Sequence, residues 1–70
     1  MDMQIIETAA QAAKLPPGTV VGIPPLWMTT AEKRADVFRG GRAGWFINGA
    51  DFPVSDGQLF TYGRGWAVRP

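Results

Sequence analysis

The sequence contains no cysteine and no histidine among its 70 residues. Without cysteine the chain cannot form a disulfide bond, and without either residue it cannot build the usual structural zinc site. Histidine is the commonest general acid or base, and cysteine is a frequent nucleophile, so two main routes to catalysis are missing. We therefore expect no catalytic residue, no metal and no cofactor, and we do not expect an enzyme.

The sequence also lacks a strong net charge and a long apolar run. Its net charge is +1, from seven basic and six acidic residues, unlike the strongly basic domains that bind nucleic acid. No apolar stretch approaches the roughly 20 residues that cross a bilayer, and the start, MDMQIIETAAQ, lacks the features of a signal peptide. We expect a cytoplasmic protein with no membrane partner, and the absence of cysteine fits a reducing compartment.

The composition is that of a small globular domain. Hydrophobic residues make up 46% of the chain and charged residues 19%, so we expect one domain over residues 1–70. A domain of this size buries only roughly 60% of its unfolded surface. Stability must come from packing, mainly of the aromatic residues, or from self-association.

The first part of the chain predicts a strand, a helix and a second strand. A short β-prone run at 4–6 precedes Thr8 and Gln11, whose spacing matches a capping box. The alanines that follow favour a helix over 8–15, which the next proline ends. The sequence PPG then predicts a type II turn, and TVVGI predicts a strand over 19–23.

Residues 26–34 allow two interpretations. Thr29 and Glu32 could form another capping box and one helical turn, or the segment could be a long loop. We expect the next strands at 36–39 and 45–48, joined by a glycine-rich loop. A two-residue Gly-Gly turn would place two arginines opposite each other, which is unfavourable. We prefer a five-residue loop, which pairs Arg39 with Trp45, Phe38 with Phe46, Val37 with Ile47 and Asp36 with Asn48.

The last part of the chain predicts a helical turn and a closing strand. Ser55 and Gln58 match a capping box, and WAVR at 66–69 is strand-like. Together these elements indicate an α+β fold, a small bent antiparallel sheet or half-barrel of about five short strands with one N-terminal helix.

Three features are candidates for function. Asp51 and Asp56 could form a carboxylate pair, but aspartate is so common in turns and caps that we interpret both as structural. The second feature is the set of arginines in glycine-rich segments, Arg39, Arg42 and Arg64, near Trp45 and Tyr62. They could be solvated loop residues, could contact an acidic protein surface, or could hold single-stranded nucleic acid.

The third feature is the segment Leu26–Met28, which follows two prolines. This segment could be an exposed apolar anchor for a partner or a second copy, or Trp27 could fold back over the sheet and complete the core. For a protein partner we expect the surface at residues 24–30, with Trp27 as the apolar anchor. We assign the remaining large aromatic side chains to the core: Phe38, Phe46, Phe52, Phe60 and Trp66.

The succession LPPGTVVGI, ADVFRGGRAGWFING, SDGQLF and GWAVRP resembles short uncharacterised proteins of actinobacteria and their phages, mycobacteriophages especially. The matching positions are Leu15, Pro16, Gly18, Thr19, Val20, Val21, Trp45, Gly49, Ser55, Leu59 and Val68. Residues 23–35 depart from the pattern as a longer, proline-rich insertion. The family has no established catalytic residues. The resemblance implies a small accessory protein of phage origin in the host cytoplasm.

Our first hypothesis is a non-enzymatic binding protein that contacts a host or phage protein. The expected partner-binding residues are Trp27, Arg39, Arg42, Tyr62 and Arg64. A second hypothesis is a nucleic-acid-binding module that uses Arg39, Arg42, Trp45 and Tyr62. A third is a virion component that packs as symmetric copies, a homo-oligomer, through the apolar segment.

Overall fold

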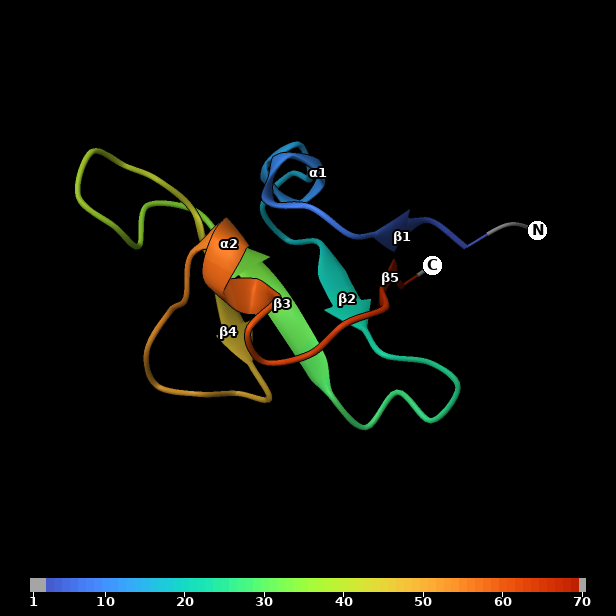
Figure 1. Ribbon diagram of the computed structural model, residues 1–70. Coiled ribbons are helices and arrows are strands. Elements are labelled where there is room, and N and C mark those ends of the chain that lie inside the picture. The colour runs from blue at the N-terminus through green and yellow to red at the C-terminus, as the bar shows by residue number, and fades with distance from the viewer. Residues whose placement is uncertain (1–2, 70) are drawn as a thin grey trace.

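The structure, a computed structural model, describes residues 3–69 (Figure 1). This part of the chain forms five strands and two helices. The strands are β1 (Ile5–Ile6), β2 (Val20–Gly22), β3 (Thr30–Arg34), β4 (Gly44–Ile47) and β5 (Trp66–Val68); the helices are α1 (Ala9–Ala13) and α2 (Asp56–Leu59). One antiparallel sheet has the order β1-β5-β2-β3-β4. The predicted α+β class, with a small open sheet of five strands, is confirmed.

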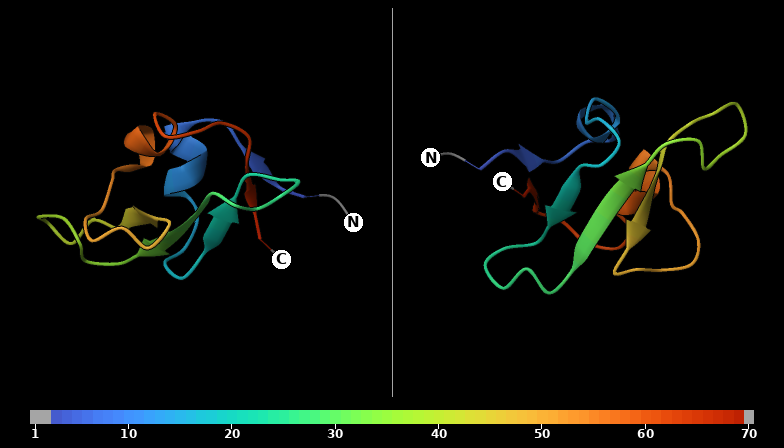
Figure 2. Two further views of the ribbon diagram at one scale, coloured as in Figure 1. Left: turned by 90° about the horizontal axis from the view of Figure 1, so that it is seen from below. Right: turned by 180° about the vertical axis from the view of Figure 1, so that it is seen from behind.

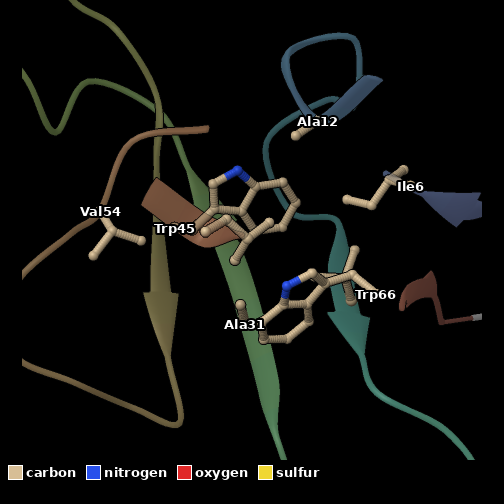
Figure 3. Close-up of a cluster of buried hydrophobic side chains, with 8 residues drawn as sticks. Ile6, Ala12, Ala31, Trp45, Val54 and Trp66 are labelled. Carbon is tan, nitrogen blue, oxygen red and sulfur yellow. The ribbon is translucent and has the colours of Figure 1, made fainter. Parts of the chain in front are cut away.

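The molecule has two layers, because both helices lie on the same face of the sheet (Figure 2). The core fills the space between the layers (Figure 3). Its two largest members, Trp45 and Trp66, are fully buried. The opposite face of the sheet carries no helix. Within residues 3–69, neither helix is long and apolar enough to span a membrane.

Both helices begin at the capping boxes that the sequence predicts. The Thr8 hydroxyl accepts from the Gln11 backbone N–H at 3.2 Å, and the Gln11 side chain accepts from the Thr8 N–H at 3.1 Å. Ser55 and Gln58 make the equivalent pair at 3.2 and 3.0 Å. Each box satisfies two backbone donors that a helix leaves without a partner. The first helix is shorter than predicted, since it ends at Ala13.

The prediction for the third strand is wrong. That strand is β3, Thr30–Arg34, and lies in the segment that we left open between a helical turn and a loop. Glu32 is therefore in a strand and forms no capping box. The residues that pair with β4 therefore differ from those predicted. Trp45 lies opposite Lys33, Phe46 opposite Glu32 and Ile47 opposite Ala31.

Residues 36–39, which we expected to be a strand, belong to the loop 35–43. The N–H groups of Val37 and Phe38 both donate to the Arg42 carbonyl, each at 3.1 Å. Asp36 has a φ of 57°, in the left-handed region, which interrupts any extended run. The two apolar residues therefore close a compact loop and do not pair with β4.

The aromatic residues are less buried than predicted. Trp66 is fully buried, but Phe38, Phe46 and Phe60 are only half-buried. Phe52 is 60% exposed, so its assignment to the core is wrong. The helices cover one face of the sheet only, so the core has room for few large rings.

Candidate functional site

The most densely bonded polar group in the described residues is the Lys33 ammonium, which lies beneath both helices. Only 3% of Lys33 is exposed. Its Nζ donates to the carbonyls of Ala12 at 2.8 Å and Ala13 at 3.2 Å, at the end of α1. It also lies 3.7 Å from an Asp56 carboxylate oxygen and 5.5 Å from the centre of a Trp45 ring.

This cluster is structural. The Trp45 indole N–H donates to Asp56 at 2.9 Å, so the carboxylate joins both the indole and the ammonium. A buried charge is tolerated only when its hydrogen-bonding capacity is met, and the Lys33 ammonium has carbonyl and carboxylate partners. No pattern in the sequence indicates this role, because a lysine in TAEKR looks like a solvated residue.

The two aspartates that could have formed a carboxylate pair have separate surroundings. Asp56 is in the first turn of α2, where a negative charge is favourable. Asp51 is exposed in the connection after β4. Among residues 3–69, no group of three or more acidic side chains is placed to hold a metal ion.

The segment that connects β2 to β3, residues 23–29, is an ordered loop. The Ile23 N–H donates to the Thr29 carbonyl at 3.0 Å, and the Trp27 N–H donates to the Ile23 carbonyl at 3.1 Å. Trp27 has a φ of 56°, which is unusual for a large side chain. Its ring lies against Gly22, where an added Cβ would come within 2.5 Å of Cε3.

This geometry divides the three apolar residues of the loop into two roles. Trp27 is half-buried and folds back onto the sheet. Leu26 and Met28, on either side of it, are 75% and 79% exposed. They are the two most exposed large apolar side chains of the described residues. The segment was predicted as a candidate surface, but the prediction named Trp27 as its anchor and not Leu26 or Met28, since their exposure depends on the direction in which Trp27 folds.

The other predicted residues occupy two further places. Arg39 and Arg42 are exposed on the loop 35–43, which lies at the opposite end of the molecule from the 23–29 loop (Figures 1 and 2). Tyr62, 54% exposed, and Arg64 lie in the connection between α2 and β5. The five residues therefore do not form one continuous site. Trp45 is fully buried, so it offers no face for stacking a base.

Arg64 lines an open pocket of about 490 Å³ beside β1. The other lining residues are Ile5, Ile6, Glu7, Phe60 and Gly65. The two ion pairs formed within residues 3–69 join Lys33 to Asp56 and Arg34 to Glu32, so neither charged group of the pocket takes part in one.

Comparison with protein-family models, curated proteins and solved structures finds no match for this chain.

Proposed function

We propose that this chain is a non-enzymatic binding protein that contacts another protein through the 23–29 loop. Leu26 and Met28 would be the anchors, and Trp27, packed on Gly22, would hold the loop against the sheet. The resemblance to small proteins of actinobacteria and their phages adds to the proposal that the protein is a phage-encoded accessory protein acting in the host cytoplasm.

The observation that carries the proposal is the exposure of two large apolar side chains on a loop with a defined backbone. Leu26 and Met28 are 75% and 79% exposed, while hydrogen bonds at Ile23 and Trp27 fix the turn that displays them. A loop that is already ordered loses little entropy when it binds, so more of the contact energy contributes to affinity. The loop contains no charged residue, which favours an apolar surface on the partner.

The polar groups support binding rather than catalysis. The Lys33 ammonium, which could otherwise act as a base or nucleophile, is buried and bonded to two carbonyls. Asp56 is engaged by the Trp45 indole. The exposed arginines Arg39 and Arg42 lie at the far end of the molecule, so any contact that they make would be separate from that of the 23–29 loop.

The proposal is tested by affinity purification from an actinobacterial host lysate with three forms of the chain. The first is the wild type, the second carries both Leu26→Ser and Met28→Ser, and the third carries Phe52→Ser. Phe52 is a matched control because it is also a large, exposed apolar residue, 60% exposed, outside the loop. All three forms should unfold at similar temperatures, since exposed substitutions change stability little.

We expect at least one host protein to be retained by the wild type and by the Phe52→Ser variant, and lost with the double variant. Direct titration of that purified protein should then show at least a tenfold weaker affinity for the double variant, because truncation of an anchor costs about 1–2 kcal/mol or more. Equal retention on all three forms, or retention on none, would contradict the proposal.

A further inference from the structure

The two edges of the sheet differ in how their backbone groups are satisfied. At the β4 edge, Trp45 exchanges two hydrogen bonds with Val54, at 2.9 and 2.8 Å, and the Ile47 carbonyl accepts from the Ala50 N–H at 2.9 Å. At the β1 edge, no further strand of residues 3–69 lies outside Ile5–Ile6 (Figure 2). Within residues 3–69, the chain therefore covers one edge of its own sheet and leaves the other open.

Ile5 presents its backbone groups to that open edge. The Val68 N–H donates to the Gln4 carbonyl at 2.8 Å, so Gln4 is a hydrogen-bonded position of the β1–β5 pair. Such positions alternate along an antiparallel strand. Ile5, opposite Ala67, is therefore a position whose N–H and C=O point away from β5. The next outward N–H along the strand is that of Glu7, and it already donates to the Gln11 side chain. Few backbone groups therefore remain for pairing at this edge.

We propose that a second copy of this chain pairs with β1 across a two-fold axis at Ile5, which gives a homodimer with one continuous ten-stranded sheet. In that antiparallel arrangement Ile5 lies opposite itself, and the two residues exchange both hydrogen bonds. Met3 lies opposite Glu7 of the partner copy, so no like charges meet within residues 3–7. Met3 and Ile5 are 50% and 39% exposed, and their apolar surface would be covered.

The register of the sheet places Ile5 in the same row of residues as the 23–29 loop. Ile5, Ala67, Gly22 and Thr30 are successive cross-strand neighbours, so they lie on one face of the sheet. This is the face without helices, since Ile6, Val21 and Ala31 on the other face belong to the core. The Trp27 ring covers Gly22 in the same row.

Pairing at Ile5 would join the rows of the two copies end to end. A 23–29 loop would then lie toward each end of the joined row. The dimer would then present two copies of the proposed anchors, and binding to a partner with two sites would gain from multivalency. The inference itself depends on β1 and does not require the proposed function to be correct.

The first test is the mass in solution, measured by sedimentation equilibrium over a wide concentration range. The wild type should approach twice the 7.6 kDa of the monomer as the concentration rises. Ile5→Lys should remain at 7.6 kDa, because it places two positive charges opposite each other. The double variant Leu26→Ser, Met28→Ser should dimerise like the wild type, which separates this inference from the proposed function.

The second test uses the absence of cysteine, which makes single-cysteine cross-linking unambiguous. With oxidised glutathione, Ile5→Cys should form a disulfide-linked dimer, because Cα atoms in a hydrogen-bonded antiparallel pair are about 5.5 Å apart. Met3→Cys is the matched control: its two thiols would be four residues apart along the strands, about 13 Å. A wild type that stays monomeric, an Ile5→Lys variant that still dimerises, or equal cross-linking at both positions would overturn the inference.

Discussion

Replacement of Lys33 should destabilise the fold more than replacement of any exposed lysine or arginine. The side chain connects the end of α1 to β3, and its ammonium lies 3.7 Å from Asp56 in α2. Lys33→Ala removes both the ammonium and the aliphatic stem. Lys33→Met keeps a stem of similar length and removes only the charge and its hydrogen bonds, so the two variants separate packing from polar contacts.

The structure sets the expected magnitudes. Removal of one member of a buried ion pair costs about 3–5 kcal/mol. Because the Asp56 carboxylate is 28% exposed and 3.7 Å away, we expect Lys33→Ala to fall near the lower end of this range. In Lys33→Met the Ala12 carbonyl loses its partner, which costs about 1–3 kcal/mol. Part of this loss is offset because a buried charge no longer has to be desolvated. We expect Lys33→Met to cost about 1–2 kcal/mol.

Urea denaturation followed by tryptophan fluorescence measures both values. A domain of this length has a free energy of unfolding of about 4–10 kcal/mol, so Lys33→Ala should lose a large part of its stability. Lys33→Met should unfold cooperatively at a lower urea concentration than the wild type, with the same slope. Two results would refute the reasoning: a loss below about 1 kcal/mol for Lys33→Ala, or equal losses for the two variants.

The contact between Gly22 and Trp27 and the cap at Ser55 lead to two further predictions about stability. Gly22→Ala should displace the Trp27 ring, since the new Cβ would come within 2.5 Å of it. We expect the free energy of unfolding to fall by about 1–3 kcal/mol and the indole to be more exposed in fluorescence quenching. Gly57→Ala is the control: an added Cβ there has no neighbour within 4 Å, so the change should be neutral or stabilising. Equal effects of the two substitutions would contradict the packing of Trp27 on Gly22. Ser55→Ala should cost about 1 kcal/mol in thermal unfolding because the cap on Gln58 is lost, and an unchanged midpoint would show that the capping box contributes nothing.

The parts of the fold that the sequence predicted correctly depend on local chemistry. The caps at Thr8 and Ser55 are set by partners three residues away. The turn at Gly18, with a φ of 94°, follows from the preceding prolines. The closing strand β5 was predicted for similar reasons. Such signals lie within a few residues of one another, so they can be recognised without knowledge of the fold.

The errors concern hydrogen bonds whose partners the residue pattern does not reveal. TAEKR does not look like a strand, because the burial of Lys33 depends on carbonyls 20 and 21 residues away in α1. Val37 and Phe38 have strand-forming side chains, but their N–H groups are taken by the Arg42 carbonyl. The segment after the two prolines could be identified as a candidate surface from composition, whereas the outward direction of Leu26 and Met28 could not.

The hydrogen bonds that close the β4 edge limit how far copies of this protein can add to one another. Because the outward N–H and C=O of Trp45 are both taken by Val54, a neighbouring chain can extend the sheet at β1 alone. An assembly with a single adhesive edge per molecule ends at two copies, whereas two open edges would allow growth into fibres. In the proposed dimer, the short backbone segment at Val54 would thus prevent growth beyond two copies by strand addition at β4.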